Sequence, residues 1–247
     1  MKLRYITCSD PREHNSLQDI ATLAKLPHTE IAAQCHPSKM SAGQPRNIWF
    51  NDLIQMAFNI DMNLAIHINQ EWANDICAKG FIPETILNWI KLEKNTDNPI
   101  IKRIQLNMPA ETATNINPDA LAKIIHDFPN QEFILQYNNN TKTAVEKLHQ
   151  TGAKFSLLFD ASGGKGVSPD SWQKPVYKNH PMGYSGGISP NNVIYNLVLI
   201  NRIVPKDDFI WIDAEGKLKS PNPANNKLLF DCNLAKQYIH RANLWQK

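Results

Sequence analysis

Length, composition and charge limit the kinds of protein that this chain can be. Its 247 residues are 42% hydrophobic and 20% charged, which is ordinary for a globular protein with a sizeable core. The 26 basic and 23 acidic residues leave a net charge of +3, and the lysines are scattered, so a nucleic-acid partner is not indicated. This length suits two small domains or one α/β barrel.

Cysteine spacing and the apolar stretches narrow the class further. The four cysteines lie far apart with no C-x-x-C pair, which argues against a structural zinc site and a disulfide framework. No apolar stretch approaches the roughly 20 residues that cross a bilayer. The start of the chain, MKLRYITCSD, lacks the apolar region of a signal peptide. We therefore expect a cytoplasmic protein without membrane contact.

Eight short runs rich in apolar, β-branched and aromatic residues predict strands. They cover residues 3–7, 30–35, 63–68, 101–107, 132–137, 154–160, 181–185 and 209–213. Helical spacing follows most of them, at residues 17–26, 49–60, 71–90, from 118, and at 143–150, 191–203 and 231–242. Ser16 is a candidate N-cap, Pro118 and Pro190 suit helix starts, and Gly80 and Pro83 should break the third helix.

Eight strand–helix units indicate a parallel sheet with right-handed crossovers. In a chain of this length they predict a single-domain (β/α)8 TIM barrel over residues 1–247. An open doubly wound sheet is the rival architecture. No G-x-G-x-x-G follows the first strand, where that fold would carry its dinucleotide fingerprint.

The active site of such a barrel lies at the C-terminal ends of its strands. This rule selects Cys8, Asp10, His36, Arg46, His67, Asn107, Gln136, Asp160, Asp213 and Glu215. Alternation along a strand adds Gln105, which shares a face with Asn107. Alternation does not decide whether Asp213 faces the barrel interior, because Trp211 and Phe209 share its parity and could equally face the helices. Arg46 belongs to a long polar loop, residues 36–47, and an arginine there suits an anionic ligand.

Residues 155–187 combine a carboxylate with flexible backbone. An apolar run ends at Asp160, and a glycine-rich loop follows it. A second run ends at Gly186 and Gly187, shortly before Pro190. Backbone N–H groups at such a turn, ahead of a helix, can hold a phosphate.

Four segments of the chain carry a resemblance to a known family. FSLLFDASGGKGVSPDSW is similar to the sixth strand and loop of phosphoribosylanthranilate isomerase, with L-L-D, G-G-x-G and D-W. GYSGGISPNNV resembles its G-G-L-x-P-x-N-V signature, and IQLN its V-Q-L-H. FIWIDAEG falls where its eighth strand reads V-D-V-S-S-G. The resemblance covers about residues 101–243 and is faint before them.

The resemblance implies a cofactor-free Amadori rearrangement of a phosphoribosyl amine in tryptophan synthesis, by a monomer or homodimer without a bound metal. It implies that Asp160 is the general acid that protonates the ribose ring oxygen, and that Cys8 is the general base. The expected substrate contacts are Arg46, His67, Gln105, Asn107, Gln136, Asp213 and Glu215. The expected phosphate contacts are Gly164, Gly186, Gly187 and Gly216.

Two departures from the family pattern keep alternatives open. The family has K-I-C-G where this chain has Y-I-T-C-S, and a slip of one residue would turn Cys8 to the other face of its strand. His67 or Asp10 would then replace it, or no base would remain. Glu215 stands where the family has small residues near phosphate. The alternatives are a barrel with an acidic pocket for a metal, cation or sugar, and a non-catalytic binding protein.

Overall fold

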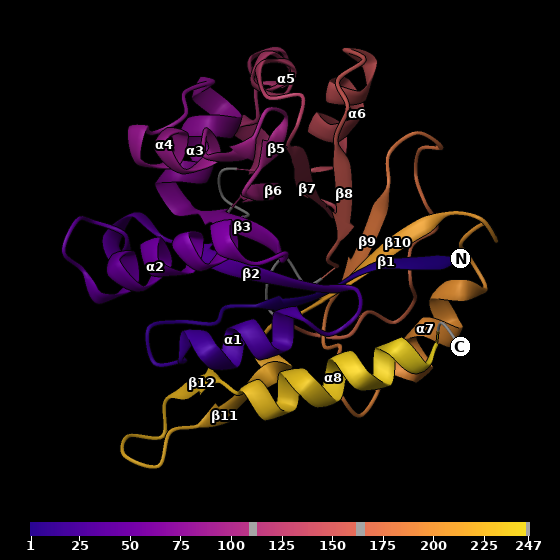
Figure 1. The fold of residues 1–247 in the computed structure, drawn as a ribbon. Coiled ribbons are helices and arrows are strands. Elements are labelled where there is room, and N and C mark those ends of the chain that lie inside the picture. The colour runs from indigo at the N-terminus through magenta and orange to yellow at the C-terminus, as the bar shows by residue number, and fades with distance from the viewer. Residues whose placement is uncertain (109–112, 162–165, 246–247) are drawn as a thin grey trace.

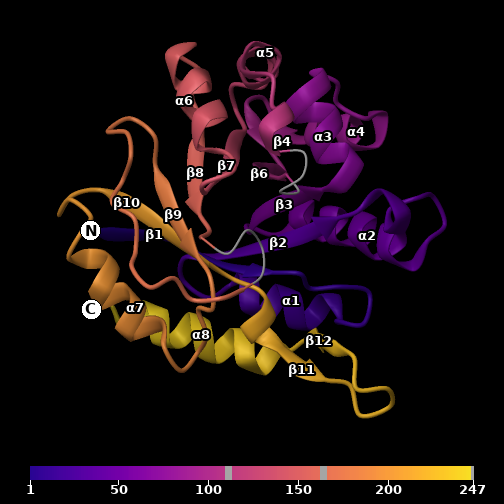
Figure 2. The same cartoon turned by 180° about the vertical axis from the view of Figure 1, so that it is seen from behind.

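The computed structural model describes residues 1–108, 113–161 and 166–245. Within these ranges, eight parallel strands close into a barrel in the spatial order β1-β10-β9-β8-β7-β6-β3-β2 (Figure 1). Strand β1 pairs with β10 on one side and β2 on the other, which closes the ring. Helices surround this ring in both views (Figures 1 and 2). The expected (β/α)8 TIM barrel is confirmed.

All the expected strands are present, with ends shifted by no more than two residues. They are β1 (Lys2–Ser9), β2 (Thr29–Cys35), β3 (Asn63–Asn69), β6 (Ile101–Asn107), β7 (Glu132–Tyr137), β8 (Ser156–Phe159), β9 (Met182–Ser185) and β10 (Phe209–Ala214).

The helices follow the expected order along the chain. They are α1 (Leu17–Ala24), α2 (Pro45–Asn59), α3 (Gln70–Lys79), α4 (Glu84–Ile90), α5 (Pro118–Asp127), α6 (Lys142–Gln150), α7 (Val193–Asn201) and α8 (Cys232–Leu244). Ser16 caps α1 by accepting a hydrogen bond from the backbone N–H of Asp19. The break at Gly80 is confirmed, because this residue ends α3 in the left-handed region with φ of 66°.

Two helices begin elsewhere than expected. Helix α2 begins at Pro45, four residues early, since proline suits the first helical turn. Arg46 therefore belongs to that turn and not to a loop, which corrects the sequence-based expectation. Helix α7 begins at Val193, and Pro190 lies in the turn before it.

Several short elements were not anticipated. Among the described residues, 3-10 turns occur at η1 (Pro37–Lys39), η2 (Ala113–Asn115) and η3 (Gly216–Leu218). Strands β4 (Glu93–Asn95) and β5 (Asn98–Pro99) form one small antiparallel hairpin, and β11 (Lys219–Pro221) and β12 (Leu228–Phe230) form another. The second hairpin extends away from the barrel near α1 and α8 (Figures 1 and 2).

The interior of the barrel is filled on the N-terminal side of the site by a buried arginine and aromatic rings. Arg103 donates to Glu30 over 2.7 Å and pairs with Glu132 at 3.3 Å. Its guanidinium lies 4.8 Å from the ring centre of Tyr5 and 4.2 Å from that of Trp211. Trp211 therefore faces inward, and the alternation along β10 brings Asp213 inward as well. The polar space above this layer is the site.

The remaining apolar core lies between the strands and the helices that cover them. This is the usual division of a barrel into a filled interior and an outer shell. Within the described ranges, no helix has the length and apolar character that crossing a membrane requires.

Candidate active site

A polar cavity of about 150 Å³ opens at the C-terminal ends of the strands. Ten of the expected site residues line it: His67, Gln105, Asn107, Gln136, Asp160, Gly186, Gly187, Asp213, Glu215 and Gly216. The structure thus brings together side chains from β3, β6, β7, β8 and β10 that are far apart in the sequence. Their common location follows from the barrel, whose strand ends meet at one face.

Several lining residues were not among the expected contacts. Gln34 lies one residue before the end of β2 and reaches the cavity, as do Ser185 on β9 and Lys217. Gln34 shares parity with Glu30, which faces inward toward Arg103. Period-two alternation along β2 would have selected it from the sequence.

Cys8 does not reach this cavity. Its neighbours on β1 face inward, because the Thr7 hydroxyl donates to Glu30 over 2.7 Å and the Ser9 hydroxyl donates to Asp213 over 2.5 Å. The Cys8 side chain lies on the opposite face, fully buried in the apolar shell. Burial raises the pKa of its thiol well above the ordinary value. The position of its side chain therefore does not support the expectation that Cys8 is the general base, since Cys8 is turned away from the mouth.

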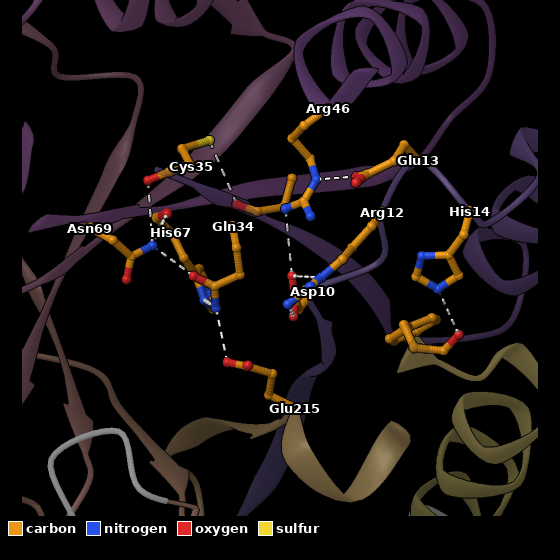
Figure 3. Close-up of polar contacts among 12 residues, drawn as sticks. Asp10, Arg12, Glu13, His14, Gln34, Cys35, Arg46, His67, Asn69 and Glu215 are labelled. Carbon is orange, nitrogen blue, oxygen red and sulfur yellow. Dashed lines mark hydrogen bonds and ion pairs between the residues drawn. The ribbon is translucent and has the colours of Figure 1, made fainter. Parts of the chain in front are cut away.

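Arg46 does not line this cavity either. Its guanidinium contacts Glu13 through Nε and lies 3.8 Å from the carboxylate of Asp10 through Nη1 (Figure 3). Both acids come from the segment after β1, and they hold the arginine at 8% exposure. The guanidinium that was expected to contact a substrate is thus paired with two acids of the chain itself.

Asp213 is the carboxylate with the clearest acid–base character. It is buried, and burial raises its pKa to about 7, with smaller contributions from the nearby charges of Glu215 and Glu30. The hydrogen bond from Ser9 acts in the opposite direction. Asp213 therefore exchanges its proton near neutral pH, as a general base or acid requires.

Asp160 follows β8 directly and lines the same cavity. Gln136 Nε2 donates to its carboxylate over 3.4 Å. Strand β9 lies between β8 and β10, so the two carboxylates flank the end of one strand. A ligand across that end would meet both.

The substitutes considered for the base have unsuitable proton affinities. Burial lowers the pKa of His67 to about 3, with a further contribution from Arg103, so the imidazole is neutral and weakly basic. Burial opposes ionisation of Asp10, but the hydrogen bond from Arg12 and the charge of Lys219 outweigh it and lower its pKa. Lys219 lies 2.7 Å from Asp10, which is thus held as an ion-paired carboxylate.

A chain of hydrogen-bonded carboxamides, here called the amide relay, runs around one wall of the mouth and ends at Glu215. Gln105 donates to Asn107 over 3.0 Å, and Asn107 donates to Asn69 over 3.1 Å. Asn69 donates to Gln34 over 2.7 Å, and Gln34 donates to Glu215 over 3.0 Å. Figure 3 shows Gln34 between Glu215 and the pair His67 and Asn69. The carboxamides of this wall are therefore oriented by one another.

Glu215 is a paired carboxylate. Its other oxygen lies 2.8 Å from Lys219, which also pairs with Asp10. Part of the repulsion that a phosphate would meet at Glu215 is thereby offset.

The glycine turn after β9 has the backbone that the sequence suggested. Gly186 and Gly187 have φ of 116° and 63°, a region that other residues rarely adopt. A Cβ on Gly187 would come within 2.3 Å of the Ser168 hydroxyl, so the loop between β8 and β9 packs closely on the turn. Lys217 adds a positive charge beside it. Gly164, another expected phosphate contact, lies outside the described residues.

Metal binding is not favoured by the arrangement of acids. Among the residues that the structure describes, no group of three or more His, Cys, Asp or Glu side chains is placed to hold a metal ion. The described residues therefore offer no set of metal ligands for the alternative in which an acidic pocket binds a metal.

Comparisons of the chain with protein-family models, with curated proteins and with solved structures give no match. The fold class is consequently known from the barrel itself, and function has to be argued from the site, because this fold supports many chemistries.

Proposed function

We propose that the protein is an acid–base isomerase that performs an Amadori rearrangement on a phosphoribosyl amine, with phosphoribosylanthranilate as the substrate to test first. One observation carries the proposal. Asp160 and Asp213 line one cavity from either side of β9, and the pKa of Asp213 is about 7. Such a pair can give a proton at one atom and remove one at another.

The reaction needs an acid at the ring oxygen and a base at C2, the carbon next to the anomeric carbon. Asp160 would protonate the ring oxygen, which opens the sugar to a protonated imine. Asp213 would then remove the proton from C2, giving an enol amine that rearranges to the ketone. A base with a pKa near the working pH combines a large ionised fraction with sufficient proton affinity. Asp213 thus takes the role that the family resemblance assigned to Cys8.

The phosphate would lie against the turn at Gly186 and Gly187. The turn exposes backbone to the cavity, and Lys217 supplies a cation. Backbone N–H groups and a lysine are common phosphate ligands. The ion pair of Glu215 with Lys219 supports this arrangement, because it reduces the negative charge nearby.

The wider setting follows from the same proposal. The enzyme would act in tryptophan biosynthesis in the cytoplasm, as a monomer or homodimer. It would need no cofactor, since both proton transfers are assigned to carboxylates of the chain.

The test is turnover of phosphoribosylanthranilate by the purified protein. Wild-type protein should convert it, and Asp160→Asn and Asp213→Asn should each lower kcat about 100-fold or more while keeping the same circular dichroism spectrum. The wild-type sequence should also rescue a tryptophan auxotroph that lacks this isomerase. Absence of both turnover and rescue would contradict the assignment of this substrate.

A second candidate function is binding of an uncharged sugar without turnover. The observation that favours it is the carboxamide wall formed by the amide relay, because amides suit hydroxyl groups. The binding affinities of ribose and ribose 5-phosphate, measured by calorimetry, distinguish the two functions. Equal affinity for both sugars would favour simple sugar binding, and a clear preference for the phosphate would favour the isomerase.

A further inference from the structure

The two ends of the amide relay determine how each carboxamide is oriented. The carboxylate of Glu215 is paired with Lys219 and can only accept, so the Gln34 atom 3.0 Å away is its nitrogen. The nitrogen of Asn69 is fixed independently, since it lies 2.8 Å from the backbone carbonyl oxygen of His67. With these two oriented, Asn107 and Gln105 have one consistent arrangement, in which each nitrogen donates to the next oxygen.

This arrangement places two donors at one nitrogen of His67. Gln34 Nε2 lies 3.3 Å and Gln105 Nε2 lies 3.4 Å from His67 Nδ1. A nitrogen that faces two N–H donors has to be the unprotonated one. A neutral imidazole then carries its hydrogen on Nε2.

The neutral state agrees with the surroundings of the ring. His67 is buried at the end of β3, and burial lowers its pKa, helped by the positive charge of Arg103 on β6 and opposed by Asp10. The ring therefore stays neutral at physiological pH. It can donate one hydrogen bond but has little tendency to take up a proton.

The donor and an unused acceptor lie on adjacent strands of the cavity wall. His67 lines the cavity, and its ring hydrogen bonds with described residues are both at Nδ1, so none of these residues is an acceptor for Nε2. His67 on β3 is in register with Gln105 on β6. Gln105 is 3% exposed, and its Oε1 has no hydrogen-bond partner among the described residues. Buried polar atoms normally have a partner, so a ligand group is a reasonable one.

We propose that the relay holds His67 as the neutral Nε2–H tautomer, and that His67 Nε2–H and Gln105 Oε1 together bind one hydroxyl group of the ligand. The hydroxyl oxygen accepts from His67, and its hydrogen is donated to Gln105. The identity of the group rests on the proposed function, in which the hydroxyl at C2 of the sugar stands on the reacting carbon. His67 is then a substrate-binding donor, and the proton transfers stay with Asp160 and Asp213.

The tautomer can be measured without any substrate. Long-range ¹H–¹⁵N correlation spectra of the labelled protein distinguish the two tautomers and the imidazolium, and His67→Gln assigns the signal. The expected result is the Nε2–H pattern, unchanged between about pH 5 and pH 8. An Nδ1–H pattern or a titrating imidazolium in this range would overturn the proposal.

A pair of variants tests whether the relay is the cause. Gln34→Leu removes one donor to Nδ1 together with the link to Glu215, and should allow the Nδ1–H tautomer to appear. Gln136→Leu is the matched control, because Gln136 lines the same cavity but donates to Asp160. It should leave the His67 pattern as in the wild type. Identical spectra for wild type and Gln34→Leu would contradict a role for the relay.

Sugar phosphates test the hydroxyl contact. Ribose 5-phosphate should shift the His67 Nε2–H signal and bind about tenfold more tightly than 2-deoxyribose 5-phosphate, which lacks the hydroxyl at C2. Equal affinities, or binding of ribose 5-phosphate without a shift at His67, would overturn the hydroxyl contact. If neither sugar binds and the tautomer is Nε2–H, the sugar-phosphate class and the hydroxyl contact both fail, whereas the conclusion about the relay stands.

Discussion

The hydroxyl of Ser9 donates a hydrogen bond of 2.5 Å to the carboxylate of Asp213, joining the ends of β1 and β10 inside the barrel. This contact has two consequences. It shows that β1 presents Ser9, and not Cys8, to the interior. It also stabilises the ionised form of a carboxylate that burial would otherwise protonate.

Removing the hydroxyl should make Asp213 a weaker acid. Ser9→Ala deletes the hydrogen bond that lowers the pKa of Asp213, so this pKa should rise above its wild-type value of about 7. The carboxyl ¹³C shift of Asp213, followed as a function of pH, measures the change. Ser185→Ala is the control, because that serine lines the same cavity but donates to the carbonyl of Phe159. An unchanged titration in Ser9→Ala would show that the hydroxyl has no influence on the carboxyl.

The raised pKa of Asp213 also predicts a pH-dependent stability. The group titrates near 7 in the folded protein and near its ordinary value of 3.8 in the unfolded chain. Between these values the folded state binds more protons, so the free energy of unfolding should fall as the pH rises from about 4 to about 7. Asp213→Asn removes this loss. In urea denaturation, the free energy of unfolding of Asp213→Asn relative to wild type should rise by a few kcal/mol between about pH 4 and about pH 7. Above about pH 7 the difference should stay constant. A constant difference at every pH would contradict the raised pKa.

Arg103 should be essential for folding stability. Arg103→Leu leaves the buried Glu30 and the partly buried Glu132 without their shared cation, which should cost about 3–5 kcal/mol in free energy of unfolding. Arg4→Ala is the matched control: Arg4 also pairs with Glu132, at 3.0 Å, but its side chain is 44% exposed. A surface pair of this kind contributes below about 1 kcal/mol. Similar losses in the two variants would contradict the buried network.

Gly183 should tolerate no side chain. A Cβ at this position would lie 2.0 Å from the ring of Trp211, which fills the barrel interior. Gly183→Ala should therefore destabilise the protein by about 1–3 kcal/mol or more, measured by thermal or urea unfolding. Gly216→Ala is a stability control, because no atom of the described residues lies within 4 Å of the added carbon. Its free energy of unfolding should change by no more than about 0.5 kcal/mol.

The barrel can be predicted well from the sequence because the patterns that mark its strands and helices are local. Apolar runs mark the strands, and residues such as Ser16 and Gly80 mark helix ends through short-range hydrogen bonds and backbone geometry. The rule that strand ends form the site then selects most of the cavity lining. Gln34 follows from alternation along β2, since it shares parity with the inward-facing Glu30, and the rule on strand ends alone does not select it.

Other features depend on contacts that no local pattern reveals. The orientation of Cys8 depends on which face of β1 turns inward, and that is fixed by partners on distant strands such as Glu30 and Asp213. Arg46 could not be placed because the acids that hold it, Glu13 and Asp10, belong to another loop. The raised pKa of Asp213 likewise arises from burial in the assembled barrel.

The most direct test of the central claim compares Asp213→Asn with Cys8→Ala in turnover of phosphoribosylanthranilate. If Asp213 is the base, Asp213→Asn should lower kcat/KM by about 100-fold or more, and Cys8→Ala, which changes a buried side chain outside the cavity, should stay within about a factor of three of wild type. Loss of turnover in a folded Cys8→Ala variant, with Asp213→Asn still active, would contradict the account.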